Sequence, residues 1–189
     1  DTPQYSSLLS RPVDPAPLNV DSLGRFLEMS LAISAWKEYQ GTRWALRCNP
    51  SSGNLHPTEG YIVAGAVDGI SDTPGLYHYA SAEHGLERRG DFDSAEWIAF
   101  ADQWPGGTFF AALTSIHWRE AWKYGERAFR YCQHDVGHAM AAYSLAAAAL
   151  GWRAARRLRS GRTHAQVILR VERRNRWAAA LTAAGKAGY

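Results

Sequence analysis

Residues 48–64 read CNPSSGNLHPTEGYIVA and join a polar loop to the first residues of an apolar strand. The loop offers the hydroxyls of Ser51 and Ser52, the backbone amides around Gly53 and the side-chain amide of Asn54. Glycine lets a backbone approach a ligand closely, so such a loop can bind the polar edge of a heterocycle, a ribityl chain or a phosphate. A serine-rich turn without a ligand has the same composition, and the loop alone does not separate the two interpretations.

Strands and helices are predicted on both sides of this loop. Four segments read as strands, namely residues 61–67, 75–80, 107–116 and 165–171. Helices are predicted for residues 22–39, with Asp21 as the N-cap, for residues 94–100, and for the long stretch 118–150, which ends before Gly151. The elements follow no regular βαβ order and no glycine-rich fingerprint follows a strand. The pattern therefore predicts an α+β sandwich and not a doubly wound parallel sheet.

The composition is that of an ordinary globular protein. The chain has 189 residues, of which 46% are hydrophobic and 21% charged, and this length predicts one domain over residues 1–189. No apolar run has the length of a transmembrane helix, and no signal peptide is recognised. The two cysteines, Cys48 and Cys132, form no motif. We therefore expect a cytoplasmic protein that does not interact with a membrane.

Charge is unevenly distributed along the chain. Residues 1–152 carry 11 Lys and Arg against 17 Asp and Glu, a net charge of −6, whereas residues 153–189 carry 10 Lys and Arg against the single acid Glu172, a net charge of +9. A basic segment on an acidic body is compatible with nucleic-acid binding. No nucleic-acid-binding motif accompanies the charge, however. Arginines that bind a phosphate-bearing cofactor or pair with acidic residues are the favoured interpretation.

Residues 134–138 read HDVGH and have the spacing of a helical zinc site. His134 and His138 are four residues apart and would share one helix face. In the zincin motif the acid between the histidines is Glu, and Asp135 is one methylene shorter, so it would reach a zinc-bound water less well. A third ligand would have to come from His164 or Glu172, neither of which lies in a recognisable motif. The alternative is that these histidines pack between helices.

The stretch 122–152, WKYGERAFRYCQHDVGHAMAAYSLAAAALGW, carries a second group of candidate residues. On a continuous helix, Lys123, Arg127 and Arg130 would form one stripe at i, i+4 and i+7. Lys123 and Tyr124 are a candidate proton-handling pair, since both side chains titrate and both can donate hydrogen bonds. The alternative is a solvated helix face on which Lys123 pairs with a nearby glutamate.

Together, the loop and this stretch resemble the FMN-dependent nitroreductase superfamily over roughly residues 5–155. In that family a loop of the form P-S-S-x-N-x-Q-P precedes a strand and contacts the flavin. The matching residues are Pro50, Ser51, Ser52, Asn54 and Pro57, while His56 replaces the glutamine.

The chain is most similar to the branch of this superfamily that oxidises azolines to azoles in thiazole- and oxazole-containing peptides. That branch carries a Lys-Tyr pair ahead of the long helix, matched here by Lys123 and Tyr124. It also has the pattern R-x-x-x-x-D-x-G-H before an alanine-rich helix that ends in L-G. The matching residues are Arg130, Asp135, Gly137 and His138, followed by LAAAALGW. The resemblance thus explains HDVGH without zinc and leaves His134 incidental.

The resemblance implies a sandwich in which helices flank a central, mostly antiparallel sheet, with a long central helix. It implies an FMN cofactor, a small-molecule substrate and a nicotinamide as a candidate electron donor. In this family the flavin lies at a dimer interface, so a homodimer is implied, or a tandem chain that mimics one. Two alternatives stay open: a zinc-dependent hydrolase, and a non-catalytic binding module with the same fold.

The resemblance also assigns roles to individual residues. Lys123 and Tyr124 would be catalytic, and no residue would bind a metal. The family's phosphate-binding R-R-S-x-R segment is not found, and Arg43 and Arg47 are its natural substitutes. The residues expected to bind the cofactor are Arg43, Arg47, Pro50, Ser51, Ser52, Gly53, Asn54, His56 and Arg127.

Overall fold

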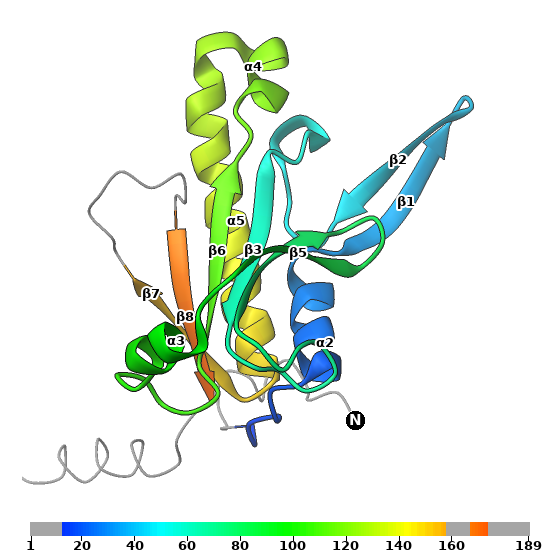
Figure 1. Cartoon of the computed structure of the whole chain (residues 1–189). Helices are drawn as coiled ribbons and strands as arrows, with labels where there is room; N and C mark the ends of the chain where they lie inside the picture. The colour runs from blue at the N-terminus through cyan, green and yellow to red at the C-terminus, as the bar shows by residue number, and fades with distance from the viewer. Residues whose placement is uncertain (1–12, 158–166, 174–189) are drawn as a thin grey trace, which may run out of the picture.

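In the computed structural model of the chain, which describes residues 13–157 and 167–173, one antiparallel sheet has the strand order β5-β4-β3-β6-β8-β7 (Figure 1). Its strands are β3 (Thr58–Ala64), β4 (Gly75–Ala80), β5 (Gly85–Asp91), β6 (Phe109–Ser115), β7 (Trp152–Arg157) and β8 (Val167–Arg173). Helices α2 (Val20–Leu31) and α5 (Ala128–Ala149) cover one face of the sheet, and α3 (Ser94–Ala101) lies against the other. The predicted α+β fold with a helix-flanked antiparallel sheet is confirmed.

The four predicted strands correspond to β3, β4, β6 and β8, and their ends differ from the prediction by at most three residues. The outer strands β5 and β7 were not predicted. Their sequences, GLERRGD and WRAARR, are rich in arginine and lack an apolar run. Edge strands commonly carry charged side chains and therefore lack the hydrophobic pattern by which strands are predicted.

Helix α2 is shorter than predicted. Asn19, not Asp21, is the N-cap: its side chain accepts from the Ser22 backbone N–H, and the Ser22 hydroxyl oxygen accepts in return from the Asn19 N–H. The helix ends at Leu31, and the residues predicted to continue it form strand β1 (Ile33–Tyr39). Asp21 lies in the first turn, where its negative charge favours the helix N-terminus.

Strands β1 and β2 (Thr42–Arg47) form a separate hairpin that projects from the body of the molecule (Figure 1). Gln40 and Gly41 connect them, with φ angles of 48° and 77°. Positive φ at both turn residues suits the right-handed twist of a tight hairpin. The hairpin forms although the preceding residues have the apolar spacing of a helix, so the prediction of a helix up to Tyr39 was wrong. Most of β1 is exposed, including the large aromatic side chains of Trp36 and Tyr39.

The predicted long helix over residues 118–150 is interrupted. It consists of α4 (Trp118–Tyr124), the 3₁₀ turn η2 (Gly125–Arg127) and α5. The break lies at Gly125, whose φ of 56° and ψ of −134° are not helical. Lys123 therefore does not share a helical stripe with Arg127 and Arg130. At the other end, Gly151 follows the C-cap of α5 with a φ of 69°, which confirms it as the C′ glycine.

Four aromatic rings in contact hold α2, α5 and the sheet together. Phe26 of α2 lies 4.9 Å from Tyr143 of α5, nearly parallel, and meets Phe109 of β6 edge-on at 5.6 Å. Trp152 of β7 lies 5.5 Å from Phe109, and its indole N–H donates to the Ala16 carbonyl. All four rings are buried. Among the described residues, no helix is long and apolar enough to cross a membrane.

The aromatic core gives a matched pair of stability predictions. Phe26→Ala should lower the free energy of unfolding by about 3–5 kcal/mol, because it removes a buried ring and leaves a cavity. The buried Tyr143 hydroxyl has no hydrogen-bond partner among the described residues. Tyr143→Phe should therefore change that free energy by less than about 1 kcal/mol. Urea unfolding followed by circular dichroism measures both, and equal losses for the two variants would contradict this account of the core.

Candidate functional site

The carboxylate of Asp135 on α5 holds the polar loop in place. The Ser51 hydroxyl donates to it at 2.6 Å, and Ser52 donates through its backbone N–H at 3.1 Å and its hydroxyl at 3.2 Å. Asp135 is 0% exposed, so these charge-assisted bonds compensate the desolvation of a buried carboxylate. The residues before β3 are thus attached to α5 across the interior of the protein.

The hydrogen bonds of Asp135 and His138 argue against a zinc site at HDVGH. Asp135 is occupied by the loop serines, and His138 donates from Nδ1 to the Pro50 carbonyl at 3.1 Å. His134 is exposed. Of the other suggested ligands, Glu172 lies on β8 in an ion pair with Arg170, and His164 falls outside the described residues. The described part of the chain contains no group of three or more His, Cys, Asp or Glu side chains that could hold a metal ion. A zinc-dependent hydrolase is therefore not favoured.

The loop conformation depends on residues that tolerate positive φ. Gly53, Asn54 and His56 have φ angles of 63°, 59° and 48°. The Asn54 amide donates to the Ala45 carbonyl at 2.9 Å, and its oxygen lies 2.8 Å from Nε2 of His56. Burial, and next the charge of Arg47, lowers the pKa of His56 to about 4. His56 is thus neutral at pH 7, and it donates from Nε2 to the Asn54 oxygen.

The structure brings the Lys123-Tyr124 pair directly onto this loop. A Cβ built at Gly53 would lie 2.8 Å from Lys123 Nζ and closer still to the Tyr124 hydroxyl. A larger residue at this position would displace the ends of both side chains, and the positive φ independently favours glycine. Lys123 is exposed, whereas Tyr124 is half-buried and packs on Tyr131 with ring centroids 4.5 Å apart. Two segments 70 residues apart in sequence therefore meet at one point.

Two arginines lie close to the loop. Arg47 is half-buried and donates to the Thr58 carbonyl at 3.3 Å; burial is the main cause that lowers its pKa. Arg119 donates to the His56 carbonyl at 2.9 Å and forms a short ion pair with Glu59. Glu59 in turn lies 2.7 Å from His78. Arg119 and Glu59 were not predicted, because an isolated arginine after a strand carries no sequence signal for a pairing that only the fold creates.

The other two predicted arginines lie elsewhere. Arg43 is in the projecting hairpin, where its guanidinium stacks 4.3 Å from the centre of the Trp36 ring. Arg127 lies just before α5 and is exposed, with no hydrogen bond or ion pair to another described residue. The structure therefore gathers Arg47, but not Arg43, with the loop.

Glu120 of α4 is a buried acid beneath the site. It is 0% exposed, and neither carboxylate oxygen has a hydrogen-bond partner among the described residues. Burial and then the nearby Asp135 carboxylate raise the pKa of Glu120. The direction of this shift is the one expected for a carboxyl group that is buried close to the carboxylate that binds Ser51 and Ser52.

Comparison with known proteins identifies relatives of this arrangement. The family model described as "Nitroreductase family" matches residues 10–155. No curated protein matches the sequence. Among solved structures, a "putative nitroreductase" from Anabaena variabilis ATCC 29413 is 26% identical with a TM-score of 0.66, and the match covers 90% of this chain and 36% of that one. The chain thus spans about a third of the length of that protein.

Two further solved structures share the fold at 15% identity and a TM-score of 0.64. One is the Escherichia coli microcin synthetase McbBCD complex with truncated pro-MccB17 bound, where the match covers 93% of this chain and 75% of that chain. The other is a "putative nitroreductase" from Ralstonia eutropha JMP134, where it covers 93% and 85%. At this identity the likeness shows the fold alone.

The buried carboxylate is tested by Asp135→Asn. An amide oxygen cannot accept from all three serine donors, so at least one partly buried donor loses its partner and the free energy of unfolding should fall by about 1–3 kcal/mol. His134→Ala, on the same helix but exposed, is the matched control and should change it by less than about 0.5 kcal/mol. Chemical denaturation of both variants measures the difference. An unchanged stability in Asp135→Asn would show that the carboxylate does not hold the loop.

Proposed function

The chain belongs to the nitroreductase family, and on this basis we propose that it is an FMN-dependent oxidoreductase that transfers hydride between the flavin and a small organic or heterocyclic substrate. Membership of the family supports a flavin-type oxidoreductase in general. The observation that carries the more specific proposal is the meeting of Lys123, Tyr124 and Gly53. It joins a potential proton-handling pair to the loop that resembles the family's flavin-contacting segment.

The residues around the loop fit an anionic, polar cofactor. Arg47, Arg119 and Lys123 place positive charge near the loop, and only Glu59 forms a described ion pair with one of them. Asn49 is buried beside the loop, and both polar atoms of its amide lack partners among the described residues, so a further polar group is expected there. The fit is incomplete in one respect: the side chains of Ser51, Ser52 and Asn54 already have partners within the protein.

We therefore assign the loop a binding role that relies mainly on its backbone. The backbone around Gly53 would contact the polar edge of the flavin. The Pro50 and His56 carbonyls, which already accept from His138 and Arg119, would line the site beside it. Arg47 would meet the phosphate, with Arg43 and Arg127 available from a second subunit, because arginine is the best bidentate partner for phosphate. Serine hydroxyls and the Asn54 amide would keep this backbone in shape. When bound, FMN supplies the hydride chemistry, and the protein orients it and controls protons.

Lys123 and Tyr124 are proposed to handle the proton that accompanies hydride transfer. Oxidation of a carbon substrate releases a hydride and a proton, and Lys123 Nζ, exposed beside Gly53, would accept that proton in its unprotonated form. The Tyr124 hydroxyl lies against the same glycine and can donate or relay a hydrogen bond. A reduced or oxidised nicotinamide is a candidate redox partner.

A second subunit is proposed to complete the site. Trp118, Trp122 and Phe129, on α4 and the first turn of α5, are 70%, 71% and 66% exposed. Large exposed aromatic side chains in one region mark protein or ligand interaction surfaces. We propose that a homodimer, or a tandem domain that mimics one, covers these residues.

Binding of FMN is the first test. Added FMN should shift its absorption spectrum and raise the unfolding temperature, more than FAD does. Asn54→Ala should weaken FMN binding by a few-fold to about tenfold, since it removes hydrogen bonds between neutral groups that shape the loop. The control His134→Ala should bind FMN as the unmodified protein does. The proposal is wrong if FMN causes neither a spectral shift nor stabilisation.

The role of the lysine is tested by Lys123→Ala, with Lys37→Ala on β1 as the control. Lys123→Ala should retain flavin and its reduction by dithionite, but slow the oxidation of a thiazoline probe by about 10²–10⁴-fold, the usual effect of losing a general acid or base. Loss of flavin from this variant would make Lys123 a cofactor ligand. Unchanged flavin content and turnover would make it a solvated side chain.

A further inference from the structure

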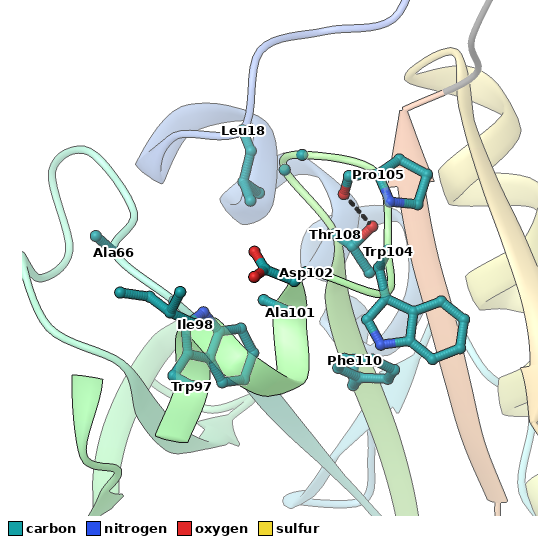
Figure 2. A pocket seen from close by; sticks show the side chains of 13 residues that line it. Leu18, Ala66, Trp97, Ile98, Ala101, Asp102, Trp104, Pro105, Thr108 and Phe110 are labelled. Atoms are coloured by element: carbon teal, nitrogen blue, oxygen red, sulfur yellow. Dashed lines mark hydrogen bonds between the residues drawn. The ribbon is translucent and has the colours of Figure 1, made fainter. Parts of the chain in front are cut away.

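A second candidate site lies at the opposite end of strands β3 and β6 from Lys123 and Tyr124. A cavity of about 420 Å³ opens between α3, the residues after β3 and the loop that precedes β6 (Figure 2). β6 spans seven residues between this cavity and the segment that leads to α4, which corresponds to about 20 Å. The cavity therefore does not belong to the proposed flavin site. Its volume falls in the range of about 300–1,000 Å³ of small-molecule sites.

Aromatic rings form the walls of this cavity. Trp97 of α3, Trp104 of the following loop and Phe110 of β6 line it, with Leu18 on the opposite side (Figure 2). Phe110 lies 5.3 Å from Phe100 and 6.2 Å from Trp104, so the rings support one another. The wall is preformed and presents flat apolar surfaces.

Trp97 is held in place by a glycine. A Cβ built at Gly65 would lie 2.5 Å from the indole Nε1 of Trp97, so the ring packs directly on the Gly65 backbone. Helix α3 has no buried residue, and Ile98 is 58% exposed although it is apolar. An apolar helix with no buried residue is poorly explained as a core element, and is better explained as the wall of a binding cavity.

A negative charge points into the cavity. Asp102 is the C-cap of α3, and its carboxylate is directed into the space between Trp97 and Leu18 (Figure 2). The carboxylate makes no hydrogen bond or ion pair with another described residue, and it adds to the negative end of the helix dipole. Two arginines of β8, within the described part of the chain, are engaged with other groups: Arg170 stacks on Trp104 and pairs with Glu172, and Arg173 donates to the Pro15 carbonyl.

We propose that this cavity binds a small organic cation with a flat apolar body, such as an arylalkylammonium ion. The aromatic walls take the body of the ligand and attract its charge through their ring faces, while Asp102 pairs with the ammonium group. A neutral analogue loses the ion pair, and an anionic analogue is repelled. The cavity is thus a binding site that acts independently of the redox reaction.

The test uses calorimetric titration of the full chain with three probes of similar shape: 2-phenylethylammonium, 2-phenylethanol and 3-phenylpropionate. The ammonium probe should bind about two- to fivefold more tightly than the alcohol, the gain expected from an ion pair with an exposed carboxylate such as that of Asp102. Asp102→Asn should remove this preference. Asp72→Asn, an equal charge change at an exposed residue, is the control and should retain it.

A second variant tests the cavity itself. Ala101→Leu places a larger side chain into the cavity from a helical position that favours leucine, so the ammonium probe should bind at least about tenfold more weakly while stability is kept. Equal binding of the alcohol and the ammonium, preference for the carboxylate, or no saturation with any probe up to about 10 mM would each overturn the proposal. Lys123→Ala should leave binding of the ammonium probe unchanged, which separates this site from the proposed flavin site.

Discussion

The buried carboxylate of Asp135 is the constraint around which the candidate site is built. A carboxylate at zero exposure is tolerated only if donors surround it, and Ser51 and Ser52 supply three. These hydrogen bonds hold the loop against α5. The loop leads directly into β3, a central strand of the sheet. In this position of the loop, Gly53 lies against Lys123 and Tyr124. The buried charge of Asp135 thus brings together the loop and the segment before α5, which are far apart in the sequence.

The strands that sequence patterns predicted are those with buried residues, whereas the predicted helix α3 has none. Strands β3, β4, β6 and β8 carry apolar residues that face the core, and their periodicity is visible. The hairpin β1–β2 is mostly exposed and the outer strand β7 is rich in arginine, so neither has a hydrophobic pattern to detect. The break at Gly125 was also not predicted. A glycine within a helix lowers the stability of the helix by only about 1 kcal/mol relative to alanine, so its presence alone does not indicate where a helix ends.

The candidate site shows the same division. Resemblance pointed to the loop and to Lys123 and Tyr124, and the structure places these residues together. It did not point to Arg119 or Glu59, whose ion pair forms because the first residues of β3 pair with the last residues of β6, just ahead of α4. Arg43 was chosen for its closeness in sequence to the loop, but the hairpin turn at Gln40 and Gly41 carries it into a projecting arm. Proximity along the chain was a poor guide where a turn reverses direction.

The bond between Ser51 and Asp135 joins residues 84 positions apart. Closing so long a loop costs conformational entropy before any contact repays it, so such contacts are favourable only when the intervening chain is already ordered. We therefore expect the candidate site to acquire its shape late in folding. Synthesis on the ribosome runs from the N-terminus, so strands β3 to β6 are made before Asp135, which accepts the hydrogen bonds of Ser51 and Ser52. These bonds can form only after that point.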